Sequence, residues 1–183
     1  MSYLLEKYQK EIAPALKKEF GFKNIFQIPR IEKVIVHMGI GKFITQNPQK
    51  KNQLLKEASD MLAKITGQKP AFTNAKKSIA GFKLREGLPI GLKVTLRKSR
   101  AYDFLSRLIC AALPRSRDFQ GLDQKSVGAR GVLDIGIREH IAFPEVAQQQ
   151  TSLLYGFQVS VVPTTKKREI AMRLYELLGF PFK

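Results

Sequence analysis

The chain has 183 residues and a strongly basic composition, with 32 lysine and arginine against 15 aspartate and glutamate side chains, a formal net charge of +17. An excess of this size repels itself in a compact fold, so it predicts a polyanionic partner: nucleic acid, an anionic membrane surface or an acidic protein. The length suggests a single domain over residues 1–183, and a hydrophobic content of 44% excludes a wholly disordered chain.

A membrane role and a disulfide framework are both disfavoured. The longest apolar run, Leu108 to Leu113, is far shorter than the ~20 residues of a spanning helix. Charged residues such as Glu6 and Lys7 stand where a signal peptide would need an apolar stretch. The single cysteine, Cys110, excludes an intrachain disulfide, and its apolar neighbours predict a buried, inert thiol. We therefore expect no membrane partner.

The first predicted element is an amphipathic helix over residues 3–20. Its apolar side chains recur at every fourth position, and Gly21 follows as a C-terminal stop. A run rich in β-branched residues then predicts a strand over residues 31–38. A second helix is predicted after Asn47-Pro48, which has the pattern of a cap followed by proline in the first turn, and Gly67 ends it.

The strand from Leu88 to Arg97 shows the clearest pattern. Apolar residues on one face alternate with Gly91, Lys93, Thr95 and Arg97 on the other. Period two with one apolar face indicates a half-exposed strand, packed on one side and solvated on the other. The solvated face, with its basic and hydroxyl groups, suits a phosphate backbone.

The C-terminal half continues with elements of both types. Ser99 is predicted to cap a third helix that ends before Pro114. Strands are predicted over residues 133–137 and 157–162, and a last helix over about residues 166–178. This order predicts an α+β fold: a mostly antiparallel sheet with helices layered on one face, an open basic face for RNA, and a long basic loop.

The positive charge is concentrated in one part of the chain. Residues 69–100 hold nine basic side chains and one acidic side chain, Glu86, a net charge of +8. A solvated helix face usually mixes signs, and this segment does not, so a polyanion-binding surface is favoured over an ordinary basic surface.

Within this segment, about residues 73–87 form a long connection between two strands, and long ordered loops tend to be functional. Its polar and basic side chains can meet phosphate and sugar oxygens: Asn74, Lys76, Lys77, Ser78 and Lys83. Phe82 has two interpretations, stacking on a base or pinning the loop to the body. We favour pinning, because Ile79 and Leu84 are apolar too.

An enzyme is disfavoured by the absence of a catalytic pattern. His37 and His140 lie in different predicted elements, without a cysteine or carboxylate cluster at metal-ligand spacing. The Gly39-Ile40-Gly41 turn lacks the third glycine of a dinucleotide loop, and its glycines are expected to let backbone approach RNA or to make a tight turn. We expect no metal and no cofactor. Two alternatives stay open: a DNA-binding protein, which needs a groove-reading helix, and an RNA-modifying enzyme.

The chain resembles the bacterial-type family of large-subunit ribosomal protein five, the 5S rRNA-binding family, over nearly its whole length. The resemblance rests on several long strings in the same order: Ile65–Pro70, Ala75–Gly87, Pro89–Arg97, Ala112–Leu122, Phe143–Glu145 and Gly179–Phe182. Family members usually have asparagine at the position of His37.

The resemblance implies three binding surfaces. The first grips 5S rRNA with the open sheet face and adjoining residues: His37, Gly39, Gln68, Lys69, Lys93, Thr95 and Arg97. The second is the basic loop, which would reach P-site tRNA. The third would face small-subunit ribosomal protein thirteen in an intersubunit bridge through Arg115, Arg117, Gln120, Arg138 and Gln149.

The same resemblance implies a structural role in translation rather than an activity. The expected partners are 5S rRNA, large-subunit rRNA, P-site tRNA, small-subunit ribosomal protein thirteen and other proteins of the central protuberance. The expected location is the ribosome, in the bacterial cytoplasm or in a plastid or mitochondrial matrix.

Overall fold

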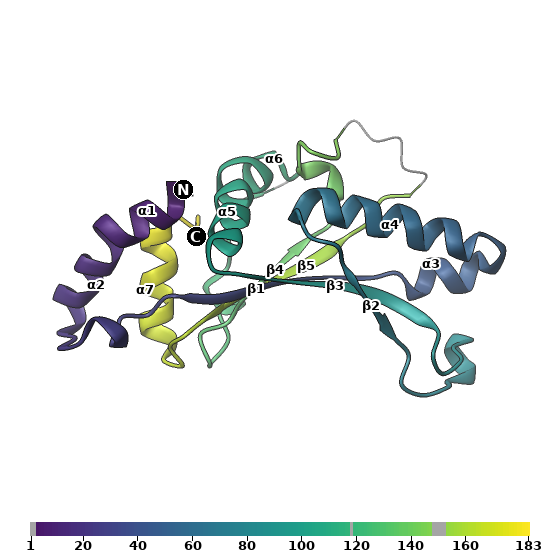
Figure 1. Ribbon diagram of the computed structural model, residues 1–183, viewed down its shortest axis with the longest axis horizontal. Coiled ribbons are helices and arrows are strands. Elements are labelled where there is room, and N and C mark those ends of the chain that lie inside the picture. The colour runs from purple at the N-terminus through teal and green to yellow at the C-terminus, as the bar shows by residue number, and fades with distance from the viewer. Residues whose placement is uncertain (1–2, 118, 148–152) are drawn as a thin grey trace. The chain divides into compact units, whose positions relative to one another are not determined.

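Within residues 3–117, 119–147 and 153–183, the parts of the chain that a computed structural model describes, five strands form one antiparallel sheet in the order β2-β3-β1-β5-β4 (Figure 1). The strands are β1 (Ile31–Gly39), β2 (Ala71–Asn74), β3 (Pro89–Arg97), β4 (Leu133–Ile137) and β5 (Phe157–Pro163). The predicted α+β fold with an antiparallel sheet is confirmed.

Burial along the strands alternates with period two, as the sequence predicts. In β5 every second residue from Phe157 to Pro163 is buried, and the residues between them are half-buried. In β4 the three apolar side chains are buried, whereas Asp134 and Gly136 are exposed. Each of these strands therefore has one face committed to a core and one face open to polar surroundings.

The chain divides into two compact units. Unit 1 comprises residues 1–35, 95–135 and 159–183, and unit 2 comprises residues 36–94 and 136–158. Strand β2 lies wholly in unit 2, whereas the other four strands contribute residues to both units.

The N-terminal helix of unit 1 spans the predicted residues 3–20 but contains a π-helical turn. Its segments are α1 (Tyr3–Lys7), the π-helix η1 (Tyr8–Ile12) and α2 (Ala13–Phe20). Leu4, Ile12 and Leu16 are buried, which confirms the amphipathic pattern. Gly21 ends the helix in the left-handed conformation, with φ at +64°, a conformation that glycine adopts without a Cβ clash.

The helix that follows β3 continues past Pro114, so the prediction that it ends before this proline is wrong. Its segments are α5 (Ser99–Arg107), the π-helix η5 (Leu108–Ala112) and α6 (Leu113–Arg115). A proline inside a helix removes one N–H donor and its ring crowds the preceding turn. In both helices a π-helical turn ends two residues before the proline, Pro14 or Pro114, and the wider turn makes room for the ring.

One predicted cap and one predicted burial are also wrong. Ser99 is the first residue of α5, and Lys98 occupies the cap position without a side-chain bond. Asn47 does occupy the N-cap position of η3, with Pro48 in the first turn as predicted, although its side chain makes no capping bond. Cys110 is exposed, because it lies in the π-helical turn between Leu108 and Ala112, which take the buried positions. Apolar neighbours in sequence therefore do not place the thiol in the core.

The C-terminal helix α7 (Arg168–Leu178) packs in unit 1, and Gly179 ends it. The buried hydroxyl of Tyr175 donates to the carbonyl oxygen of Gly131 at 2.7 Å and lies 3.0 Å from that of Val161. This side chain fixes α7 against the turn before β4 and against β5.

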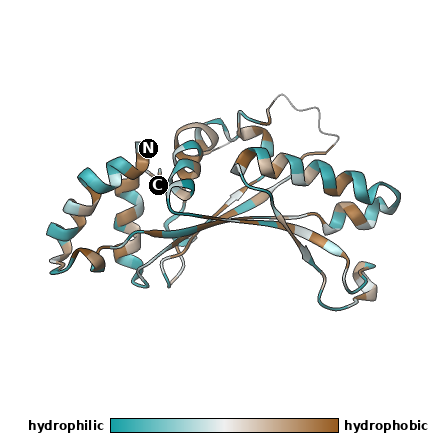
Figure 2. Cartoon of the chain, in the orientation of Figure 1, coloured by the Kyte–Doolittle hydropathy of each residue, from teal (hydrophilic) through white to brown (hydrophobic). Residues whose placement is uncertain are grey.

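The helices of unit 2 are α3 (Gly41–Gln46), the 3-10 turn η3 (Pro48–Lys50) and α4 (Lys51–Thr66). Helix α4 lies along one face of the strands of this unit (Figure 1). Hydrophilic and hydrophobic residues alternate along it (Figure 2). The residues that it buries follow the helical period: Leu54, Ala58, Met61, Leu62 and Ile65. Gly67, with φ at +68°, ends it as predicted.

Shorter 3-10 turns connect these elements: η2 (Ile25–Gln27), η4 (Ala80–Phe82), η6 (Gln124–Ser126) and η7 (His140–Ala142). None of the helices in the described residues is long and apolar enough to cross a membrane.

Candidate nucleic-acid interface

Strand β3 has the predicted alternating exposure from Leu92 to Arg97, whereas Gly91, predicted on the open face, is buried and Ile90 is only half-buried. Leu92, Val94 and Leu96 are buried, whereas Lys93 and Arg97 are exposed and Thr95 is half-buried. Lys93 belongs to unit 2, and Thr95 and Arg97 belong to unit 1. The strand therefore presents a polar and basic face whose opposite side is fixed by the core.

In unit 2, atoms of Thr73 and Met38 approach the backbone of β3 closely at Gly91. A Cβ atom at this position would lie 2.7 Å from Thr73 Oγ1 and 2.8 Å from the carbonyl oxygen of Met38. Strand β2 pairs with β3 so that Thr73 lies opposite Gly91 and Ala71 opposite Lys93. Only glycine, which has no Cβ, leaves room for the Thr73 hydroxyl beside the backbone of β3 at this position.

Other residues predicted to bind 5S rRNA lie in unit 2. His37 and Gly39 are exposed on β1, and a Cβ at Gly39 would have no atom within 4 Å. Lys69 is exposed and Gln68 half-buried in the connection from α4 to β2. The Thr66 hydroxyl donates to the Leu62 carbonyl at 2.7 Å and lies 3.0 Å from the Gln68 carbonyl oxygen. It also accepts from the backbone N–H of Gln68 at 3.4 Å, so this connection has a fixed conformation.

The basic side chains of this segment are exposed, and those from Lys69 to Lys98 have no acidic partner among the described residues. All nine basic residues between positions 69 and 100 are exposed. Those from Lys69 to Lys98 form no ion pair with the part of the chain that the structure describes. Charges that the fold does not neutralise are available to an external anion.

The basic loop between β2 and β3 is closed by its own backbone. Ala75 N–H donates to the Leu88 carbonyl at 2.8 Å, and Gly87 N–H donates to the Ala75 carbonyl at 3.0 Å. Nearer the tip, Ile79 and Leu84 exchange both N–H···O bonds, each 3.1 Å long. The loop is therefore an extension of the β2–β3 hairpin.

The loop presents the predicted side chains to solvent. Asn74, Lys76, Lys77, Ser78 and Lys83 are all exposed. The Ser78 Oγ accepts a bond from Glu86 N–H at 2.9 Å, which leaves its own O–H free to donate.

Phe82 does not pin the loop to the body, so that interpretation is wrong. Its side chain is 70% exposed, and that of Ile79 is 46% exposed. The Ile79–Leu84 backbone pair holds the tip instead, and Phe82 lies in the 3-10 turn η4 between these two residues.

The residues predicted for the intersubunit bridge are divided between the two units. Arg115, Arg117 and Gln120 are exposed in unit 1, and Arg138 is exposed in unit 2. Gln149 lies outside the described residues.

Sequence reasoning missed a second basic cluster in unit 1. Arg30 and Lys98 line a pocket of about 390 Å³ together with Arg97. Lys98 belongs to the basic segment, whereas Arg30 lies among both acidic and basic residues. No sequence pattern connects the two. Their proximity depends on the pairing of β1 with β3.

The two histidines have different environments. His140 is 0% exposed, and its Nδ1 accepts a bond from Tyr155 N–H at 3.2 Å, so it cannot reach a substrate. Burial lowers the pKa of His140. His37 is exposed on β1. No group of three or more His, Cys, Asp or Glu side chains that could hold a metal ion occurs in the described residues.

An open basic strand face, a basic loop and a sheet supported by helices are the features of a structural RNA-binding protein of the ribosomal class. Family models match two parts of the chain: residues 24–85 match Ribosomal protein L5, and residues 89–182 match the ribosomal L5P family C-terminus.

Relatives over the full length agree with these matches. The chain is 47% identical to the large ribosomal subunit protein uL5 of Caldanaerobacter subterraneus over 182 residues, which cover 100% of this chain and 99% of the relative. It is 48% identical to that of Desulfatibacillum aliphaticivorans, with coverage of 100% and 99%. It is 46% identical to that of Thermus thermophilus, with coverage of 98% and 96%.

The chain belongs to the ribosomal protein L5 family. It is a structural, RNA-associated component of the ribosome and not an enzyme. The RNA-modifying alternative is thereby excluded.

Proposed function

We propose that the protein is a structural constituent of the large ribosomal subunit that binds 5S rRNA in the central protuberance. The observation that supports this most directly is the set of basic side chains from Lys69 to Lys98 in an L5-family chain, which are exposed and form no ion pair within the described residues. It acts as one folding domain over residues 1–183.

The 5S rRNA grip combines charge with shape-specific bonds. Lys69, Lys93 and Arg97 neutralise phosphates, and release of condensed counterions favours binding. Thr95 and Gln68 supply hydrogen bonds, and Gly39, with open space around it, lets RNA approach the backbone of β1. His37 offers a ring for stacking or bonding where the family usually has asparagine.

The side chains of the basic loop contact the sugar-phosphate backbone of P-site tRNA. Lys76, Lys77 and Lys83 meet phosphates, while Asn74 and the free Ser78 O–H donate to phosphate or sugar oxygens. Such contacts are independent of sequence, as a site through which every tRNA passes requires. The hydrogen-bonded hairpin supports these side chains.

A third surface joins the subunits. Arg115, Arg117, Gln120, Arg138 and Gln149 face small-subunit ribosomal protein thirteen. Other central-protuberance proteins and large-subunit rRNA are further neighbours of the protein in the ribosome.

The test is a double charge reversal with a matched control. Lys93→Glu with Arg97→Glu should weaken 5S rRNA binding on the order of 100-fold at physiological salt and leave the thermal unfolding midpoint unchanged. Lys166→Glu with Lys167→Glu makes the same change in net charge at exposed positions before α7. This control should weaken binding only slightly. Equal losses in the two proteins, or retention of 5S rRNA by the first, would contradict the assignment of this face.

A further inference from the structure

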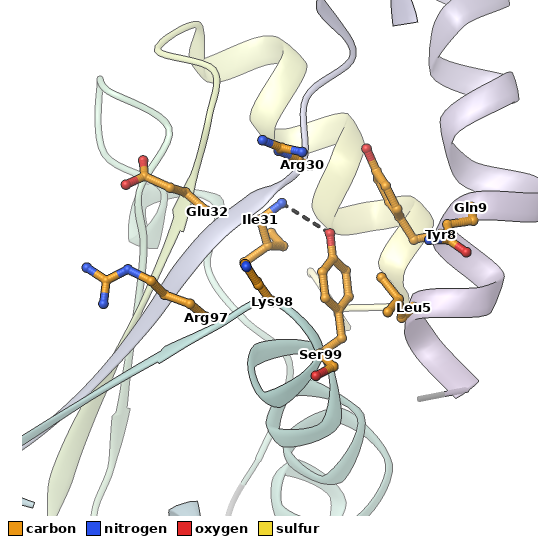
Figure 3. A pocket seen from close by; sticks show the side chains of 10 residues that line it. Leu5, Tyr8, Gln9, Arg30, Ile31, Glu32, Arg97, Lys98 and Ser99 are labelled. Carbon is orange, nitrogen blue, oxygen red and sulfur yellow. Dashed lines mark hydrogen bonds between the residues drawn. The ribbon is translucent and has the colours of Figure 1, made fainter. Parts of the chain in front are cut away.

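Unit 1 contains a pocket that, apart from Arg97, involves none of the residues assigned above to an RNA contact. It has a volume of about 390 Å³. The N-terminal helix contributes Leu5, Tyr8 and Gln9, and the junction between β3 and α5 contributes Arg97, Lys98 and Ser99 (Figure 3). This size lies within the usual range for small-molecule pockets.

The aromatic part of the pocket is held rigidly. The rings of Tyr8 and Tyr102 have centroids 5.7 Å apart and are tilted by 40°. Both hydroxyls bond to backbone. Tyr8 donates to the Pro29 carbonyl at 3.0 Å. Tyr102 accepts from Ile31 N–H at 3.3 Å, the bond drawn as a dashed line from Ile31 in Figure 3. Tyr102 is buried and forms the floor, whereas Tyr8 is only half-buried. The pocket therefore offers preorganised ring surface.

The rim of the pocket is cationic. Arg30, Arg97 and Lys98 line it with one acidic side chain, Glu32, a net charge of +2. Glu32 is partly neutralised by Lys33, whose Nζ lies 3.3 Å from its Oε1. Within the described ranges, none of the three cations forms an ion pair.

The position of Arg30 is fixed by backbone bonds rather than by its charge. Its N–H donates to Thr164 Oγ1 at 3.1 Å, and its carbonyl accepts from Thr164 N–H at 2.9 Å. The guanidinium is thus left exposed at the rim. Burial raises the pKa of Tyr102 to about 12.

Lys98 lies at this rim and has a backbone conformation that is strained for every residue except glycine. Its φ is +54° and its ψ is −135°. Glycine adopts this region readily, whereas a residue with a Cβ is strained there. The protein thus keeps a lysine ammonium beside the pocket at a position where glycine would relieve strain.

We infer that this pocket binds one unstacked nucleotide of the rRNA, with its base against Tyr8 and its phosphates at Arg30, Arg97 and Lys98. The inference rests on the proposed function for the identity of the RNA. Aromatic ring surface beside unpaired cations matches a base and its phosphate, and single unstacked bases are the elements that proteins read in RNA by stacking. Gln9 and Ser99 stand at the rim and can bond the base edge or sugar.

The test is titration of the isotopically labelled full-length chain with adenosine 5′-monophosphate, followed by amide chemical shifts. Saturable shifts are expected at Ile31, Ser99 and Tyr102. Adenosine and inorganic phosphate, added separately, should each bind at least about tenfold more weakly, because each lacks one of the two interactions. Lys10→Gln, on the same helix but outside the pocket, should leave the affinity unchanged.

Two variants separate binding from folding. Lys98→Gly should raise the unfolding midpoint by relieving the backbone, yet weaken nucleotide binding about threefold or more by removing the cation. Tyr8→Leu should weaken binding, and Tyr8→Phe, which keeps the ring, should restore it. A loss of affinity in a more stable protein cannot be attributed to misfolding.

The inference is overturned if adenosine 5′-monophosphate produces no saturable shifts at these amides. It is also overturned if the shifts spread evenly over the basic surface, or if neutral indole binds more tightly, which would indicate an apolar protein side chain as the occupant. Retention of 5S rRNA by the unmodified protein is measured in parallel. The pocket can therefore fail while the proposed function stands, and a loss of 5S rRNA selectivity would count against the proposed function itself.

Discussion

The basic residues of α7 and those between positions 69 and 98 are the same residue types in opposite situations. Arg168 donates to the carbonyl oxygens of Val127 and Gln124 at 3.0 and 2.9 Å. Arg173 bonds the carboxylates of Glu19 and Glu176 at 3.0 and 2.9 Å. The lysines and arginines of the other segment have no acidic partner in the described part of the chain. The fold uses the charges of α7 for its own cohesion and leaves the other charges for a partner.

This difference separates the contribution of basic residues to stability from their contribution to RNA binding, which composition alone does not distinguish. Substitution of a basic residue that bonds to other parts of the chain should lower stability and leave RNA binding unchanged. Substitution of a basic residue without such a bond should weaken RNA binding and leave stability unchanged. The glycines extend the comparison, because Gly91 is enclosed by neighbouring atoms and Gly39 faces open space.

The largest stability effect is expected at Gly91. Gly91→Ala places a Cβ within 3 Å of the Met38 carbonyl oxygen and Thr73 Oγ1, and overpacking of this kind costs about 2–3 kcal/mol. Gly39→Ala should leave the free energy of unfolding unchanged within about 0.5 kcal/mol and weaken only the approach of RNA. Urea unfolding of both proteins measures this. Equal destabilisation of the two would show that the sheet is uniformly intolerant of a methyl group.

A matched pair of cation removals should give a smaller effect. Arg168→Met loses its two bonds to backbone carbonyls and should lower the free energy of unfolding by about 1–2 kcal/mol without changing 5S rRNA affinity. Lys93→Met should leave stability unchanged and weaken 5S rRNA binding. If Arg168→Met lost RNA binding as strongly as Lys93→Met, the division between the two regions would be wrong.

The smallest effect is a pH dependence of stability from His140. Burial lowers its pKa in the folded state below the unfolded value, about 6.5. The unfolded chain then binds more protons below that pH, so this contribution is fully present above about pH 6.5 and is lost as the pH falls toward the folded pKa. Urea unfolding at pH 7.5 and 5.5 should show a shallower dependence in His140→Gln than in the unmodified protein. The exposed control, His37→Gln, should keep the original dependence.

Much of the fold follows from local patterns in the sequence. The alternation from Leu88 to Arg97 and the fourth-position spacing before Gly21 each predict an element that the structure confirms. The end of the third helix could not be predicted, because a π-helical turn lets Pro114 continue the helix where proline usually stops one. Helix α3 was missed because Gly41-Lys42 has no helix-start pattern.

The candidate site was predictable only where charge and strand period coincide. Lys93 and Arg97 satisfy both, and both are exposed. The pocket with Arg30 and Lys98 was not predictable, because its members come from the N-terminal helix and from the ends of β1 and β3, which meet only in the folded chain. The outward position of Phe82 depends on the backbone pairing of Ile79 with Leu84, which apolar composition does not show.

The most direct test of the central claim is binding of the purified chain to 5S rRNA across a salt series, beside a folded RNA of equal length. Electrostatic attraction alone weakens steeply and equally for both RNAs as salt rises. We expect 5S rRNA to keep a large preference at high salt, because the open face adds shape-specific bonds to its charge. Coincident curves would contradict this account and leave a basic RNA-binding surface without selectivity for 5S rRNA.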